Sequence, residues 1–170
     1  MDKVIIIGGS PSWNMAPHDV ESWGATNLIL KRPVNRVVDM NDYSNDAWGT
    51  GETKAANKAR EHARAAGIPY IDLDSYPIED IKHFFKTDYF SGTIDYMIAL
   101  AIYEGAKEID LYGVSVSSGG YLYQKPGIDY WCGQAMGRGI EVGIYGESTI
   151  MKTIDGLMYG YGTKQEIRND

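Results

Sequence analysis

The sequence predicts a single α/β domain in which a mostly parallel β-sheet is covered by helices on both faces. Three observations support this: strand-like apolar runs alternate with helix-like segments, the first run is apolar without interruption, and 170 residues suit one domain. The residues of a parallel strand are apolar without interruption because helices cover both faces of the sheet. We expect this domain to span residues 1–160 and a C-terminal tail to span residues 161–170.

The first part of the chain contains one clear strand and two strand candidates. Val4–Ile7 is a β-branched run that ends at a Gly- and Ser-rich turn, which is typical of a buried strand followed by a tight turn. Asn27–Leu30 and Arg36–Met40 are two further short apolar runs, separated by Lys31-Arg32-Pro33. Either of them could be a strand of the same sheet.

The middle of the chain shows the alternation of helix and strand most clearly. Gly51–Ala66 is rich in Ala, Lys, Glu and Arg, and Gly67 follows it, which predicts a helix and its end. The remaining elements are a strand, a short helix, a longer helix, a strand, a helix and a last strand, at Ile68–Leu73, Ser75–Lys86, Ser91–Glu104, Glu108–Val116, Asp129–Gly137 and Ile140–Tyr145. This order predicts a Rossmann-like topology.

Composition excludes several classes of function. A net charge of −7 disfavours a nucleic-acid-binding face, and no apolar run is long enough to span a membrane. The amino terminus has no features of a secretory signal, so we expect a cytoplasmic protein. One cysteine, Cys132, and scattered histidines at positions 18, 62 and 83 give no metal-ligand spacing. We expect neither a metal nor a cofactor.

The turn after the first strand is the first candidate binding segment. Gly8, Gly9, Ser10 and Ser12 lie where a parallel sheet forms its ligand crevice, and glycines allow backbone amides to approach phosphate oxygens. Trp13 stands in place of the third glycine of the dinucleotide fingerprint, and the lysine of a P-loop is absent. The alternative is a tight turn in which Ser12 caps a helix.

Two further segments are candidates for the same ligand. Ser91, Gly92 and Thr93 precede an apolar helix, whose amino terminus would attract an anion, although ordinary capping explains the same residues. In the loop after the predicted strand Glu108–Val116, Tyr121 and Tyr123 could stack on a base or sugar and Lys125 could meet a phosphate. The alternative there is a flexible surface loop with packing aromatic residues.

Asp39 is a separate candidate at the end of the Arg36–Met40 run. Its carboxylate could bind a ribose hydroxyl or act as a base, and an aspartate at such a position also commonly starts a turn. No catalytic residue can be assigned from the sequence.

Four stretches together resemble the bacterial sialyltransferases that use a cytidine-monophosphate sugar donor, and the related 6-hydroxymethylpterin diphosphokinase-like domains. They are Val4–Ser12, Trp23–Asn27, Phe90–Thr93 and Ala101–Val114. The resemblance implies a nucleotide surrounded by Ser10, Ser12, Asn27, Ser91, Gly92 and Thr93. Those enzymes have a catalytic histidine in their later part, whereas the last histidine of this chain is His83.

The stretch Tyr121–Pro126, with Tyr130 and Trp131 after it, resembles small proteins that are common in tailed-phage genomes. This resemblance implies a protein of the bacterial cytoplasm that could sequester a nucleotide-derived immune signal. Three functions therefore stay open. They are binding of a phosphate-bearing nucleotide-type small molecule, transfer or hydrolysis of a nucleotide or nucleotide-sugar by Asp39, Tyr121, Tyr123 or Asp129, and an interaction protein with a vestigial crevice. A homo-oligomer is compatible with each.

Overall fold

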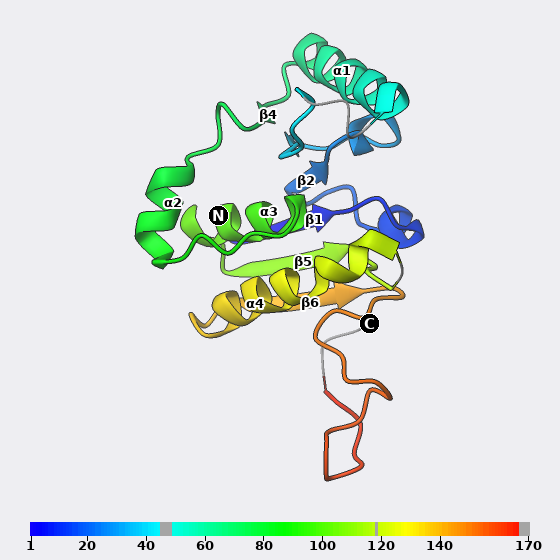
Figure 1. Ribbon diagram of the computed structural model, residues 1–170, viewed down its shortest axis with the longest axis vertical. Helices are drawn as coiled ribbons and strands as arrows, with labels where there is room; N and C mark the ends of the chain where they lie inside the picture. The colour runs from blue at the N-terminus through cyan, green and yellow to red at the C-terminus, as the bar shows by residue number, and fades with distance from the viewer. Residues whose placement is uncertain (45–48, 118, 167–170) are drawn as a thin grey trace.

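The computed structural model describes residues 1–44, 49–117 and 119–166, which form one six-stranded sheet with helices packed against it (Figure 1). All five pairings between neighbouring strands are parallel. The strands are β1 (Lys3–Ile7), β2 (Ser22–Ala25), β3 (Arg36–Val38), β4 (Tyr70–Ile71), β5 (Glu108–Tyr112) and β6 (Glu141–Tyr145). The predicted class, a Rossmann-like α/β domain with a parallel sheet, is confirmed.

The order of the strands in the sheet is β4-β3-β2-β1-β5-β6. From β1 the chain moves outward to β4, and it then returns to the other side of β1 to form β5 and β6. The direction of winding therefore reverses between β1 and β5. In open α/β sheets, ligands bind at the carboxyl ends of the strands at such a reversal. The loops that follow the two neighbouring strands run in opposite directions there and leave a crevice between them.

Helices cover both faces of the sheet. Val4 and Ile6 of β1 point into a cluster with α2 (Ile78–Phe85), α3 (Thr93–Tyr103) and α4 (Lys125–Met136). Ile5 and Ile7 point into a second cluster on the opposite face, with α1 (Gly49–Ala66) and the 3-10 helix η2 (Leu28–Leu30). Alternate residues of one buried strand thus supply both halves of the core.

Aromatic side chains join the three helices of the first face. The indole of Trp131 on α4 lies edge-on to Phe85 of α2 at 4.8 Å and stacks on Phe90 at 4.9 Å. Phe90 in turn stacks on Tyr96 of α3 at 4.2 Å, and the indole nitrogen of Trp131 donates to the carbonyl of Tyr89. This cluster fixes the segment that leads into α3.

The second strand, β2, lies earlier in the chain than either of the two apolar runs that were expected to form strands. Asn27–Leu30 is not a strand: residues 28–30 form η2, and β2 is Ser22–Ala25. The apolar residues Leu28 and Ile29 pack on the sheet from outside rather than within it. In β2 only Trp23 is a large apolar residue, and Gly24 packs against Leu28 and Val34, so the strand has no recognisable periodic pattern. The other candidate run, Arg36–Met40, does contain a strand, β3, over Arg36–Val38.

Two boundaries differ from the prediction around the fifth strand. β5 ends at Tyr112 rather than at Val116, because Gly113 has a φ of +63° and turns the chain out of the sheet. The predicted loop after it contains a 3-10 helix, η4 (Gly119–Tyr123), and α4 begins at Lys125 rather than at Asp129. Pro126 lies in the first turn of α4, where its missing N–H is not required.

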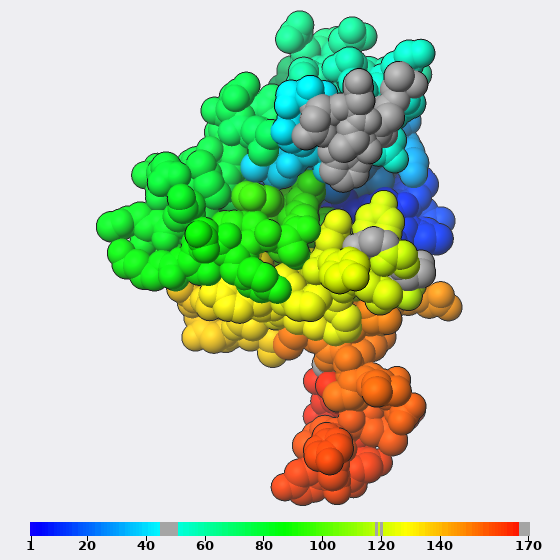
Figure 2. All heavy atoms as spheres, in the orientation of Figure 1, coloured from blue at the N-terminus to red at the C-terminus, as the bar shows by residue number. Residues whose placement is uncertain are grey.

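The chain after β6 projects from the body as an arm, defined here as residues 152–166 (Figures 1 and 2). Leu157 and Lys164 pair across it, and the side-chain oxygen of Gln165 accepts hydrogen bonds from the amide and hydroxyl of Thr153. The predicted boundary at residue 160 falls inside this arm and stays a prediction. Within the described residues, no helix is both long and apolar enough to cross a membrane.

Candidate functional site at the carboxyl edge of the sheet

The loop after β1 is bonded closely to the loop after β5. The amide of Gly8 donates to the carbonyl of Tyr112 at 2.8 Å, and the amide of Ser10 donates to the carbonyl of Gly113 at 2.9 Å. A Cβ at Gly8 would lie 2.5 Å from the carbonyl oxygen of Gly113. The Ser10 hydroxyl also accepts from the Ser115 amide at 3.3 Å. Two of the amides expected to face a phosphate are therefore engaged inside the protein.

Ser12 joins three loops, whereas Gly9 is open to solvent. The Ser12 hydroxyl accepts from the amide of Gly113 at 3.0 Å and donates to the carbonyl of Tyr145 at 3.4 Å. Ser12 lies within the 3-10 helix η1 (Pro11–Met15), and its side chain does not cap that helix. Gly9 is exposed, and a Cβ there would meet nothing within 4 Å.

A buried arginine holds the end of the same loop. Arg32 donates to the carbonyls of Trp13, Ala16 and Pro17 at 3.1, 2.9 and 3.0 Å. Burial lowers the pKa of its guanidinium. In the sequence Arg32 stands only between two apolar runs, with no sign of a role, whereas in the fold it fixes the chain after β1.

The start of α3 also lies at the carboxyl edge. The other end of α3 is at the amino edge, where Glu104 pairs with Arg36 at the beginning of β3 at 2.7 Å. The amide and hydroxyl of Ser91 donate to Asp95 Oδ2 at 2.6 and 2.8 Å. A Cβ at Gly92 would lie 2.7 Å from the side chain of Gln124. Ser91, Gly92 and Thr93 are thus partly exposed beside the first turn of α4.

The loop before α4 presents aromatic side chains to solvent. Tyr121 is 62% exposed and Tyr123 is 84% exposed, so neither packs into the core of this chain. Lys125 pairs with Asp129 one turn along α4, and Asp129 Oδ1 accepts from the amide of Met151 at 2.7 Å. The cation that was expected to meet a phosphate is therefore held in place by a carboxylate.

A hollow of about 410 Å³ lies beside this loop, and we call it the lysine hollow. Lys125 and Lys152 supply positive charge, and the Thr149 hydroxyl is buried without a hydrogen-bond partner. Among the described residues, Lys152 forms no ion pair. The lining is completed by residues of the loops after β5 and β6, of η4 and of the arm: Val116, Ser117, Leu122, Ser148, Thr153, Ile154 and Gly156.

Of the residues predicted from the sequence, only Lys125 lines this hollow. The turn Gly8–Ser12 and the segment Ser91–Thr93 lie at the same edge of the sheet but do not line it. Ser148, Thr149 and Lys152 were missed because no element or motif was predicted in the chain between Tyr145 and the tail at residues 161–170. Their signal is positional: hydroxyl residues follow the last parallel strand at its carboxyl end.

Asn27 lies at the carboxyl end of β2, at the start of η2. It is partly exposed, and its side chain makes no capping hydrogen bond. The preceding residue, Thr26, has a φ of +48°, which few non-glycine residues adopt. Asn27 is therefore placed at the expected edge, two strands away from the lysine hollow.

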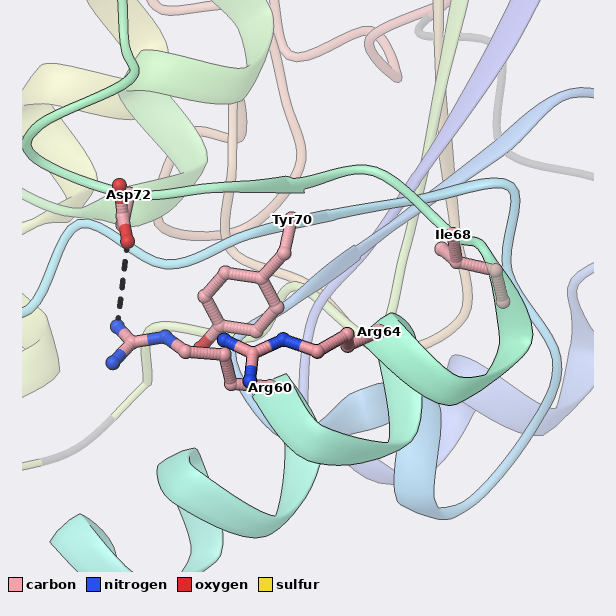
Figure 3. Close-up of a pocket in the computed structure, with 5 residues that line it drawn as sticks. All are labelled: Arg60, Arg64, Ile68, Tyr70 and Asp72. Atoms are coloured by element: carbon pink, nitrogen blue, oxygen red, sulfur yellow. Dashed lines mark hydrogen bonds and ion pairs between the residues drawn. The ribbon is translucent and has the colours of Figure 1, made fainter.

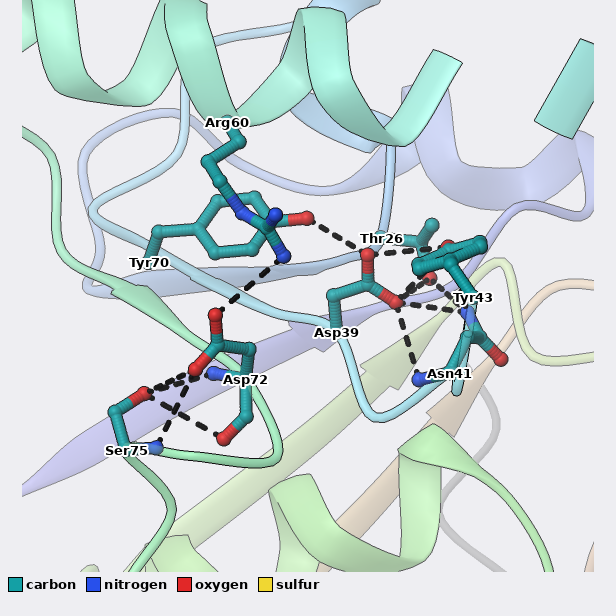
Figure 4. Close-up of polar contacts among 8 residues, drawn as sticks. All are labelled: Thr26, Asp39, Asn41, Tyr43, Arg60, Tyr70, Asp72 and Ser75. Atoms are coloured by element: carbon teal, nitrogen blue, oxygen red, sulfur yellow. Dashed lines mark hydrogen bonds and ion pairs between the residues drawn. The ribbon is translucent and has the colours of Figure 1, made fainter. Parts of the chain in front are cut away.

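Asp39 is the centre of a hydrogen-bond network at the end of β3 (Figure 4). It is 1% exposed, and it accepts hydrogen bonds from Tyr70 Oη at 2.7 Å, Asn41 Nδ2 at 2.8 Å, Tyr43 Oη at 3.1 Å and Thr26 Oγ1 at 3.4 Å. The backbone N–H of Asn41 also donates to the Asp39 carboxylate, so the turn expected after Asp39 is present. Burial, and then the charge of Asp39, raises the pKa of Tyr43 to about 12.

Asp39 Oδ1 and Oδ2 therefore both accept hydrogen bonds from groups of the protein itself. Burial also raises the pKa of Tyr70, with the hydrogen bond to Asp39 as the second cause. These phenols stay protonated at neutral pH and continue to donate to the carboxylate. The arrangement ties the ends of β2, β3 and β4 together.

The part of the chain that the structure describes holds no cluster of three or more His, Cys, Asp or Glu side chains that could bind a metal. Cys132 is fully buried, and burial raises the pKa of its thiol to about 12. A thiol in this environment stays protonated and packs as a small apolar side chain.

Comparisons with known proteins find distant similarity in structure but no match by sequence. No family model matches the chain, and no curated protein matches it. The sialyltransferase CstII from Campylobacter jejuni with CMP-3FNeuAc is 16% identical with a TM-score of 0.43, over 85% of this chain and 80% of that one. A protein from Lactobacillus plantarum is 15% identical with a TM-score of 0.47, over 85% and 61%. These values assign no family, ligand or activity.

Proposed function

We propose that this protein binds a phosphate-bearing nucleotide-type small molecule at the carboxyl edge of its sheet. The observation that supports this best is the lysine hollow, a space of about 410 Å³ that is lined by Lys125, Lys152 and Thr149. Small-molecule sites are concave and mostly apolar, with a few polar groups that fix orientation. The apolar lining from Val116, Leu122 and Ile154 fits that description.

The charge of the hollow favours an anion. The chain carries a net charge of −7, so two lysines that line one hollow stand out against the rest of the sequence. Asp129 neutralises Lys125, and Lys152 stays available for a phosphate. A charge-assisted hydrogen bond of this kind is about twice as strong as a neutral one.

The aromatic residues beside the hollow suit the rest of a nucleotide. Tyr121 and Tyr123 are exposed on η4, whose Leu122 lines the hollow, so their rings are free to cover a base or sugar. The candidate segments Gly8, Gly9, Ser10, Ser12, Asn27, Ser91, Gly92 and Thr93 surround this edge and stay proposed parts of the site. Gly9 is the position of the first loop with open space in front of it.

We further propose that the ligand is retained and not converted, as a phage protein that sequesters a nucleotide-derived immune signal would do. Two residues considered for catalysis have other contacts. Asp39 accepts hydrogen bonds from the side chains of four residues, and Asp129 holds Lys125 and the Met151 amide. Neither carboxylate is available as a base without breaking these contacts.

Calorimetric titration with cytidine monophosphate, adenosine monophosphate and cytidine tests the proposal. We expect both nucleotides to bind more tightly than the nucleoside, and Lys152→Gln to weaken nucleotide binding about tenfold, the value of one charge-assisted hydrogen bond. Lys58→Gln, at an exposed position on α1, is the control for loss of one positive charge.

Equal affinity for nucleotide and nucleoside, or an unchanged affinity in Lys152→Gln, would contradict the site. Ion-exchange chromatography of each nucleotide after incubation detects turnover, and released phosphate or base would establish the transferase or hydrolase alternative. Mass spectrometry of small molecules released from the purified protein would identify the natural ligand.

A further inference from the structure

A second hollow lies beside β4, the outermost strand on the side of the sheet away from β6. It has a volume of about 300 Å³ and is lined by Arg60 and Arg64 of α1 and by Ile68, Tyr70 and Asp72 (Figure 3). The two arginines are one helical turn apart, so both side chains leave the same face of α1. None of these residues takes part in the lysine hollow.

Positive charge exceeds negative charge in this second hollow. Asp72 is the one carboxylate that lines it, and its Oδ2 lies 3.4 Å from Arg60. The other oxygen of Asp72 accepts from the Ser75 hydroxyl at 2.8 Å. Arg64 forms no ion pair within the described residues. One guanidinium is therefore left without a counter-charge in an acidic protein.

Arg60 is held in position but not fully satisfied. Its guanidinium lies over the ring of Tyr70, 5.1 Å from the centroid, and Tyr70 is itself fixed by its hydrogen bond to Asp39 at 2.7 Å. The Nε of Arg60 is buried and has no hydrogen-bond partner. A buried donor without an acceptor costs free energy, so the contacts of Arg60 within the protein leave part of its guanidinium unsatisfied.

We propose that this second hollow binds a phosphate group of a small molecule at a site separate from the lysine hollow. Guanidinium groups are donors only, and their fork of N–H groups matches two oxygens of one phosphate. The free donors of Arg64 and the guanidinium of Arg60, which Asp72 contacts only at 3.4 Å, supply such a pair. A volume of about 300 Å³ is at the lower end for small-molecule sites, so the bound group is small.

An NMR titration of the full chain with inorganic phosphate at constant ionic strength tests this proposal. The Nε–H resonances of Arg60 and Arg64, assigned with Arg60→Lys and Arg64→Gln, should shift and saturate together. Arg138 is the internal control because it also lies over an aromatic ring, 4.9 Å from the centroid of Phe85, but does not line the hollow. Its resonance should not follow the saturating curve.

Arg64→Gln should weaken phosphate binding about tenfold, the effect of losing one charge-assisted hydrogen bond. Arg64 is exposed, so the variant should fold, and its amide spectrum checks this. The shifts of Arg60 and Arg64 should persist in Lys152→Gln, which alters only the lysine hollow. Shifts that are absent, that are the same for all three arginines, or that are unaffected by Arg64→Gln would overturn the proposal.

Discussion

Asp95 lies inside the protein at the start of α3, where its Oδ2 accepts hydrogen bonds from Ser91 and its Oδ1 has no partner. Burial raises the pKa of this carboxyl to about 6, although the hydrogen bonds from Ser91 and Gly92 oppose the shift. A Cβ at Gly127 would lie 2.4 Å from Oδ2, so α4 closes over the group. The carboxylate orders the Ser91–Thr93 segment and is costly to ionise there.

The raised pKa of Asp95 predicts that its contribution to stability falls as pH rises. The folded chain binds this proton more tightly than the unfolded chain, so stability is lost between the usual pKa of 3.8 and about 6. The shift corresponds to about 3 kcal/mol. The free energy of unfolding of Asp95→Asn, relative to the natural chain, should therefore rise by about 2 kcal/mol from pH 4 to pH 7, because the unfolded carboxyl is already partly ionised at pH 4. Urea unfolding at several pH values measures it.

Asp88→Asn, at an exposed position, is the control for loss of one negative charge in the same experiments. A difference between Asp95→Asn and the natural chain that stays constant from pH 4 to pH 7 would show that the carboxyl is not perturbed by burial.

At the residue scale, the sequence predicts where a side chain lies in the fold better than it predicts which groups that side chain contacts. Ser91 was expected to cap a helix or meet an anion, and the structure shows it donating to Asp95 four residues later. Lys125 was expected in a binding loop, and it does line a hollow. Its ion pair with Asp129 depends on where α4 begins, and the sequence places that start four residues too late.

At the scale of elements, the loops after β1, β5 and β6 are hydrogen-bonded to one another at the carboxyl edge. Gly113 has a φ of +63°, and a Cβ there would lie 2.6 Å from the carbonyl oxygen of Gly8 and 3.0 Å from that of Ser10. Gly105, which follows α3, has a φ of +81°, and a Cβ there would meet nothing within 4 Å. The two glycines thus share a backbone conformation but differ in their surroundings.

Gly113→Ala should destabilise the protein more than Gly105→Ala. Both substitutions force alanine into the left-handed region, which costs about 1–2 kcal/mol. Only Gly113→Ala adds a clash with backbone atoms, and overpacking of this kind costs about 1–3 kcal/mol more. Chemical denaturation of the two variants measures the difference. Equal losses of stability would mean that the two loops separate without cost.

The sequence predicts the elements with long patterns and misses β2, whose residues form no periodic pattern. The helix predicted over residues 51–66 corresponds to α1, and the strand over residues 4–7 corresponds to β1. β2 has four residues, among which only Trp23 is a large apolar side chain, so the longer apolar run at Asn27–Leu30 gave a stronger local signal. Tertiary packing against the sheet, rather than local propensity, decides between the two segments.

At the scale of the whole molecule, sequence alternation predicts a parallel sheet but not its order. Pairing of β1 with both β2 and β5 creates the reversal of winding, and that choice depends on contacts between residues about a hundred positions apart. The lysine hollow has the same origin, since its lining comes from the loops after β5 and β6, from η4 and from the arm. No local pattern brings Lys125 and Lys152 together.

The exposed tyrosines beside the lysine hollow lead to the last prediction. The double variant Tyr121→Ala, Tyr123→Ala should weaken nucleotide binding by about 1–3 kcal/mol, the range for stacking of a base on an aromatic side chain. Its free energy of unfolding should change little, because both rings are mostly exposed. Calorimetric titration beside thermal unfolding separates the two effects.

Tyr159→Ala, Tyr161→Ala is the matched control, because these two tyrosines are also exposed but lie on the arm and do not line the hollow. If Tyr121 and Tyr123 instead form a contact between copies of the chain, their removal should lower the sedimentation coefficient of the protein and leave affinity for nucleotide unchanged. Full affinity in the Tyr121→Ala, Tyr123→Ala variant would exclude stacking on η4, and it would leave the lysine hollow alone to account for binding.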